Sequence, residues 1–260
     1  MLPLYLYILI FILGLAVGSF LNVLIYRIPR NMNFIFTRSI CPKCRKGIKF
    51  YDNIPVISYL ILRGKCRHCG ERISRRYPLM ELLNGLIYLF LYWHLGPRID
   101  FYIYAFLSSL LIIIFFIDLD FQIIPDLITL PGMVIGLALS FLPGGLGIIP
   151  SAVGLLVGGG VLYIIALLGD WLFKKESMGG GDIKMAAMLG AFLGWQKVIF
   201  IFFGSALVGL LVSLVLLYFS KKLRANRVIP FGPFLAAAAF IAILYGDRVI
   251  AYYINNFFPI

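Results

Sequence analysis

The sequence predicts an all-α protein that crosses a membrane several times. Three observations lead to this fold class: an unusually apolar composition, a series of long apolar runs, and a single long polar segment between the first two runs. Of the 260 residues, 62% are hydrophobic and only 13% are charged. Soluble domains carry about 45–50% apolar and roughly 25% charged residues, so most of this surface is expected to face lipid.

Eight apolar runs are candidates for membrane-crossing helices, which need about 20 largely apolar residues. The sixth is short and would also suit a half-helix, so seven spans are the alternative. No charge precedes the first run, whereas Arg27 and Arg30 follow it, which is typical of a retained anchor rather than a cleaved signal. The runs cover residues 4–26, 79–95, 101–118, 127–142, 148–169, 183–194, 197–219 and 232–254.

The distribution of basic residues predicts the orientation in the membrane. The segment from Arg27 to Tyr77 holds 13 of the 23 basic residues and only two acids, and such loops stay in the cytoplasm. The N-terminus is then on the outer side of the membrane, and a later basic cluster lies on the cytoplasmic side together with this loop. The net charge of +12 is explained by contact with anionic lipid, and no aromatic–basic pattern typical of nucleic-acid binding is present. The later cluster is Lys221, Lys222, Arg224 and Arg227.

All four cysteines lie in the polar segment, as two C-x-x-C pairs separated by 21 residues. Because cytosolic thiols stay reduced, a disulfide is not expected there. Paired C-x-x-C motifs match the tetrahedral coordination of zinc, and four thiolates leave no open position, which indicates structural rather than catalytic zinc. His68 is an alternative ligand in place of one cysteine. The predicted ligands are Cys41, Cys44, Cys66 and Cys69.

Two acids at the edge of the apolar runs are candidates for chemistry. Asp118 ends the third run and Asp182 begins the sixth, and the predicted topology places both at the cytoplasmic face. Charged groups at the membrane are costly and usually functional. Two carboxyl groups in one site share a proton, so one takes a proton from water while the other gives one to a carbonyl, as in aspartic proteases.

The residues around these acids leave alternatives open. Gly179–Gly181 favour an unwound segment against an extended substrate; a plain connector, with Asp182 capping the next helix, is the alternative. Asp120 lies about 200° around a helix from Asp118, so the two would not share a face. Asp126 follows Pro125 and is expected to cap the next helix. Asp120 together with Asp126 remains the alternative to Asp118 as the first acid.

These motifs, in this order, resemble the bacterial prepilin peptidases, also called type IV leader peptidases. Gly179-Gly180-Gly181-Asp182 fits the G-x-G-D motif of intramembrane aspartyl proteases. The resemblance extends over nearly the whole chain. It includes Gly18 to Val23, both cysteine pairs, Arg76-Tyr77-Pro78 with Glu81, Ile117 to Asp120, Ile124-Pro125-Asp126 and Asp182-Ile183-Lys184.

The resemblance implies a bacterial inner-membrane peptidase that removes the class III signal peptide from precursors of type IV pilins and type II secretion pseudopilins. Such precursors have a basic leader followed by an apolar helix. Asp118 and Asp182 would be catalytic, supported by Gly179, Gly181, Asp120, Asp126 and Lys184. Members with the cysteine loop also N-methylate the new N-terminus with S-adenosyl-L-methionine. The implied organisation is a first span (1–26), a zinc-binding loop (27–78) and a protease bundle (79–260).

Two other classes of protein compete with this interpretation. A proton- or cation-coupled transporter would also use intramembrane acids and broken helices. However, transporter sites lie near the membrane midplane within inverted repeats, whereas these acids lie at the edge and no internal repeat is evident. A zinc-stabilised membrane scaffold would leave the paired aspartates without a role.

Overall fold

The computed structural model describes residues 3–34, 39–175, 177–219 and 230–257. The predicted inner basic cluster (Lys221, Lys222, Arg224 and Arg227) lies outside these described residues. The chain forms two compact units, residues 1–113 and 114–260.

Long helices account for most of the described chain, which confirms the predicted all-α fold class. Five of the described helices are long and apolar enough to cross a membrane; α3 and α5 are not among them, and α5 has only 14 residues with Pro131 inside it. Two predicted runs, 183–194 and 197–219, fall in α7. The helices are α1 (Leu4–Arg27), α2 (Ile57–Ile61), α3 (Arg76–Leu95), α4 (Ile99–Phe121), α5 (Asp126–Leu139), α6 (Ile148–Phe173), α7 (Gly180–Phe219) and α8 (Gly232–Phe257).

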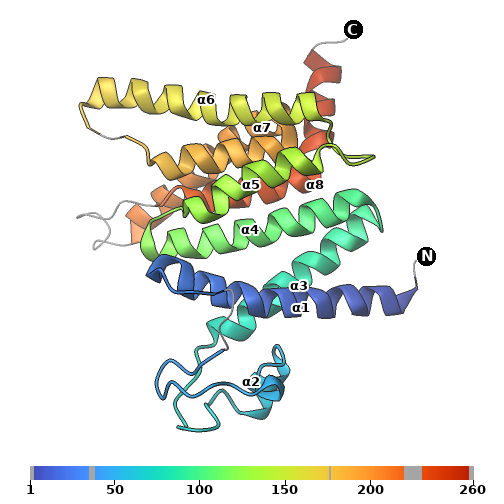
Figure 1. The fold of residues 1–260 in the computed structure, drawn as a ribbon. Coiled ribbons are helices and arrows are strands. Elements are labelled where there is room, and N and C mark those ends of the chain that lie inside the picture. The colour runs from blue at the N-terminus through green and yellow to red at the C-terminus, as the bar shows by residue number, and fades with distance from the viewer. Residues whose placement is uncertain (1–2, 35–38, 176, 220–229, 258–260) are drawn as a thin grey trace. The chain divides into compact units, whose positions relative to one another are not determined.

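In the N-terminal unit, α1 and α3 pack closely because glycines lie at their crossing (Figure 1). A Cβ on Gly14 would lie 2.8 Å from the Cα of Gly85, and a Cβ on Gly18 would lie 2.8 Å from the Cα of Glu81. Asn84, fully buried, donates its side-chain amide to the carbonyl of Gly14 at 2.7 Å. The pair is therefore joined by small-residue packing and by a buried hydrogen bond, as is usual for membrane helices.

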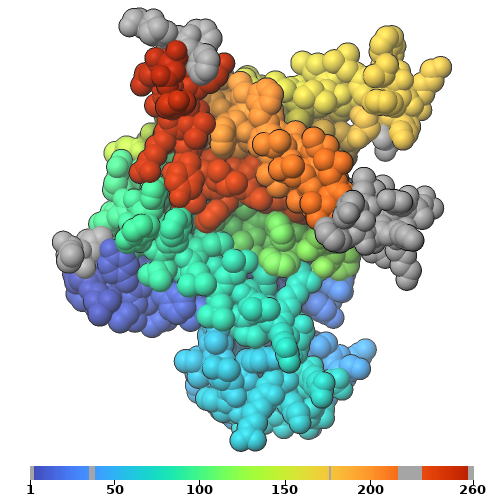
Figure 2. All heavy atoms as spheres, turned by 180° about the vertical axis from the view of Figure 1, so that it is seen from behind, coloured from blue at the N-terminus to red at the C-terminus, as the bar shows by residue number. Residues whose placement is uncertain are grey.

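The polar segment between α1 and α3 forms a lobe that protrudes from the helices of this unit, coloured cyan in Figure 2. It contains little regular structure: α2, a 3₁₀ turn at Phe50–Asp52, and two isolated bridges. One bridge pairs Ile40 with Gly47 and the other pairs Lys65 with Arg72. Each bridge encloses one C-x-x-C pair, so the two cysteine pairs lie in similar turns.

In the C-terminal unit, α6 runs alongside the first half of α7 (Figure 1). Gly154 lies against Gly190, and Gly158 lies against the carbonyl of Ala186, so closely that neither glycine has room for a Cβ. Ser151 donates its hydroxyl to the carbonyl of Ala191 at 2.6 Å. The glycines spaced four apart in α6 therefore pack against a neighbouring helix of the same unit.

Helix α7 reverses direction at Gly194, whose φ of 80° and ψ of 167° are not helical. A continuous helix would separate Gly181 from Gly209 by about 42 Å. Both lie near the start of α8, however: Gly181 contacts Ile124, which contacts Gly232, while Gly209 contacts Phe234. The break explains why one assigned helix contains two predicted apolar runs.

Candidate active site

Asp118 lies in the last turn of α4 and is only 5% exposed. Its Oδ2 accepts a hydrogen bond from the backbone N–H of Gly232 at 3.0 Å. A buried carboxylate needs such a donor, because an unpaired charge away from water is costly. Asp118 is therefore positioned by the start of a helix that lies 114 residues further along the chain.

Gly232 is a site residue that the sequence analysis missed. It is the first residue of α8, within Pro230-Phe231-Gly232-Pro233. A Cβ here would lie 2.6 Å from Oδ2 of Asp118, so only glycine allows the backbone to approach the carboxylate. The sequence signal that could have identified this residue is a glycine in a proline-flanked segment at the start of an apolar run. A helix does not need glycine in order to begin, so the residue type there needs another reason.

Asp182 is the third residue of α7, and its backbone N–H donates to the carbonyl of Gly179 at 3.1 Å. Its Oδ1 is shielded from solvent and has no hydrogen-bond partner among the described residues. The expected unwound glycine segment is wrong for Gly180 and Gly181, which are helical. Gly181 instead allows the start of α7 to approach Ile124 closely, because a Cβ at this position would lie 2.8 Å from the Cβ of Ile124.

The two acids predicted to be catalytic lie in one cluster. Ile124, in the connection between α4 and α5, contacts Gly181 beside Asp182 and also contacts Gly232, which binds Asp118. Three segments thus bring the carboxylates together: the end of α4, the start of α7 and the start of α8.

The remaining acids near this cluster are exposed. Asp120 is exposed whereas Asp118 is buried, which confirms that the two do not share a face. Asp126 does not cap α5 through its side chain, and that expectation was wrong. Its carboxylate instead receives two hydrogen bonds from Nζ of Lys184, at 2.6 and 2.8 Å. This ion pair joins the start of α5 to the fifth residue of α7, two residues beyond Asp182.

The four cysteines predicted to bind metal come together in the polar lobe. Their sulfur atoms all lie within 4.8 Å of one another, and the Sγ atoms of Cys41 and Cys69 are 3.9 Å apart. Tetrahedral zinc with Zn–S distances of about 2.3 Å places sulfurs about 3.8 Å apart, so the cluster fits this ion. The group suits a closed structural site formed by Cys41, Cys44, Cys66 and Cys69.

The two cysteine turns have the same backbone design. The N–H of Arg45 bonds to the carbonyl of Cys41, and the N–H of Gly70 bonds to that of Cys66, both at 2.9 Å. Arg45 and Gly70 both have positive φ, which turns the chain back after each second cysteine. Backbone N–H groups of Cys69 and His68 lower the pKa of Cys66 to about 7, whereas hydrogen bonds with the neighbouring thiols help to raise the pKa of Cys69 to about 11, so Cys66 is the first of these two thiols to ionise.

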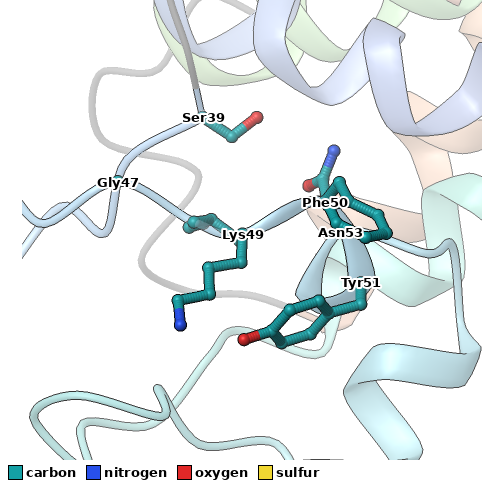
Figure 3. A pocket seen from close by; sticks show the side chains of 7 residues that line it. Ser39, Gly47, Lys49, Phe50, Tyr51 and Asn53 are labelled. Carbon is teal, nitrogen blue, oxygen red and sulfur yellow. The ribbon is translucent and has the colours of Figure 1, made fainter.

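A shallow pocket of about 560 Å³ lies in the same lobe (Figure 3). Figure 3 shows Lys49 and Tyr51 extending to the same side of the chain, and Nζ of Lys49 lies 5.6 Å from the ring centre of Tyr51. Arg67 lies 5.6 Å from the same ring centre. The described lining contains no acid, and both cations already lie at the one tyrosine ring. The pocket is therefore not assigned to a cofactor.

Arg67 also pairs with Asp52, whose carboxylate receives hydrogen bonds from Nε and Nη2 at 2.6–3.0 Å. The guanidinium holds the pKa of Asp52 below its usual value. Since Asp52 lies before α2 and Arg67 lies between Cys66 and Cys69, this pair ties the 3₁₀ turn to the second cysteine turn.

Fold and site together define a polytopic helical membrane protein with a paired-aspartate cluster and a four-cysteine loop. Two family models match the chain: the bacterial peptidase A24 N-terminal domain over residues 12–95, and the type IV leader peptidase family over residues 105–214. This protein belongs to the bacterial type IV leader peptidase family, and it is a multi-pass membrane protein.

Relatives match over nearly their full length. A protein of Aeromonas hydrophila is 36% identical over 96% of this chain and 94% of its own. Proteins of Stutzerimonas stutzeri and Neisseria gonorrhoeae are 38% and 37% identical, over 94% and 92% of this chain and 92% and 90% of their own. All three are named prepilin leader peptidase/N-methyltransferase. No solved structure matches the chain.

Proposed function

We propose that this protein is a prepilin leader peptidase that hydrolyses its substrates with Asp118 and Asp182. The observation that carries the proposal is the common cluster of these two carboxylates, formed by segments 64 residues apart in a membrane protein of this family. Neither a nucleophilic side chain nor a catalytic metal is required by this chemistry.

In the proposed reaction, the ionised carboxyl group takes a proton from a water molecule while the water oxygen bonds to the scissile carbonyl carbon. The protonated carboxyl group gives its proton to the carbonyl oxygen. One hydroxyl of the resulting gem-diol then returns its proton to the ionised carboxyl group as the C–N bond breaks, and the leaving amine takes up the proton held by the other carboxyl group. The bond from Gly232 holds one oxygen of Asp118, and Oδ1 of Asp182 is left to bond to water or substrate.

The proposed substrates are precursors of type IV pilins and type II secretion pseudopilins, which join a short basic leader to an apolar helix. We place the site at the cytoplasmic face of the inner membrane and the N-terminus outside, because the large basic loop favours that orientation. The apolar helix of a substrate would then lie in the bilayer while its leader junction reaches the two acids.

N-methylation of the new N-terminus is the proposed second activity, supported by the names of the relatives. S-adenosyl-L-methionine would be the methyl donor, and the pocket beside Tyr51 is not assigned to it. Zinc on the four cysteines is proposed to be structural. We retain a functional division into residues 1–26, 27–78 and 79–260 as part of this proposal.

Cleavage of a purified precursor in detergent tests the peptidase assignment. Asp118→Asn and Asp182→Asn are each expected to abolish cleavage while thermal unfolding stays cooperative. Asp120→Asn is the matched control, because this acid is exposed two residues from Asp118, and it should keep most of the activity. Retained cleavage in either of the first two variants refutes the paired-aspartate mechanism. If the unaltered protein cleaves no precursor, proton-coupled transport becomes the leading function.

A further inference from the structure

The short helix α2 presents an apolar surface that the N-terminal unit leaves uncovered. Ile57, Leu60 and Ile61 are 53%, 67% and 69% exposed. Their spacing of three and four residues places them on one side of a helix. A lobe surrounded by water would be expected to bury such residues, whereas exposed apolar patches mark contact with a partner or with a membrane.

The attachment of α2 to α3 indicates how deep α2 lies in the membrane. The backbone N–H of Val56, just before α2, donates to Oε2 of Glu81 in α3 at 2.8 Å. Glu81 is buried against Gly18 of α1. Arg75 and Arg76 mark the charged start of α3, and Glu81 lies five residues beyond Arg76, or about 8 Å along the helix.

Interfacial helices lie about 5–10 Å into the boundary between headgroups and acyl chains, so the start of α2 is attached at the depth of such a helix. The bond from Asn22 to the carbonyl of Tyr77, at 3.1 Å, holds the first turn of α3 against α1.

The basic residues that flank α2 favour anionic lipid as the partner of this apolar surface. Exposed Arg63 and Lys65 follow α2 directly, and Lys49 precedes it. Apolar side chains next to lysine and arginine are typical of segments that lie in the interface of an anionic bilayer. A precursor with a basic leader would be repelled by the same charges.

We propose that α2 is an interfacial anchor, with Ile57, Leu60 and Ile61 inserted among the acyl chains of an anionic leaflet and Arg63 and Lys65 at its headgroups. The bond between Val56 and Glu81 holds the anchor at this depth, and the anchor in turn holds the four-cysteine lobe against the membrane surface. This inference depends on the embedding of α1 and α3 and not on the proposed peptidase activity.

Depth-dependent fluorescence quenching tests the proposal. The full chain would carry Leu60→Trp, with Trp93, Trp171 and Trp195 replaced by Phe, in vesicles of phosphatidylcholine and phosphatidylglycerol. Phosphatidylcholine brominated near the headgroup end of its chains is expected to remove most of the fluorescence of the introduced tryptophan, and aqueous iodide should remove little. Emission should also be blue-shifted relative to the control. Glu71→Trp is the control, because this exposed acid of the same lobe is expected to face water.

Quenching of Leu60→Trp by iodide but not by brominated lipid would overturn the proposal. So would insensitivity to brominated lipid together with a spectral change on adding precursor, because α2 would then bind substrate. Ile61→Trp provides a second reporter on the same face and should behave like Leu60→Trp. Cleavage activity of the reconstituted protein, measured in parallel, keeps a failure of this inference distinct from a failure of the proposed function.

Discussion

Substitution of Gly232 by alanine tests how closely the start of α8 positions Asp118. The new Cβ would lie 2.6 Å from Oδ2 of Asp118, whereas ordinary contact begins at 3.4 Å. The two groups must therefore separate by about 0.8 Å, which stretches the 3.0 Å hydrogen bond beyond a useful length. The φ of Gly232 is not in the left-handed region, so the effect is steric rather than conformational.

A misplacement near 1 Å of a catalytic group can cost about 10²-fold in rate, and we expect a loss of this order in kcat for Gly232→Ala. KM should change little, because the substitution displaces a carboxylate and removes no contact along the apolar helix of the substrate. The assay is steady-state cleavage of a precursor in detergent, with thermal unfolding measured on the same preparation.

Gly204→Ala is the matched control. Its Cβ would lie 3.5 Å from the Cβ of Ala238, an ordinary contact between α7 and α8, so kcat should remain near that of the unaltered protein. Full kcat in Gly232→Ala would refute the argument that this backbone approach positions Asp118. An equal loss in both variants would show that general packing of α8, and not Asp118, limits the rate.

Three further predictions concern the metal loop, the ion pair and the helix crossing. Cys44→Ser should remove bound zinc, measured by elemental analysis, whereas His68→Ala should retain it because four thiols complete the shell. Lys184→Gln breaks an exposed ion pair, so the free energy of unfolding, measured by thermal denaturation, should fall by no more than about 1 kcal/mol. A larger loss would show that the pair is not screened by solvent. Gly190→Ala introduces a Cβ against the backbone of α6 and should destabilise the protein by about 1–3 kcal/mol. Gly160→Ala, with no neighbour within 4 Å, should have little effect in the same unfolding measurement.

The sequence by itself determined the fold class, because long apolar runs have no alternative to helices in lipid, where every backbone polar group must be satisfied within the chain. It also determined the grouping of Cys41, Cys44, Cys66 and Cys69, since two C-x-x-C turns can meet around one tetrahedral ion with little help from the rest of the chain. The pairing of Asp118 with Asp182 was expected from membrane topology alone, and the two now lie in one cluster.

Tertiary structure alone decided the surroundings of those acids. Gly232 reaches Asp118 across 114 residues, and no local pattern specifies such a contact. The reversal at Gly194 and the pairing of Asp126 with Lys184 likewise depend on which helices pack together. Local propensity sets where a helix forms, but the partner of a buried polar atom is set by long-range packing, and for that reason Asp126 was wrongly expected to cap α5.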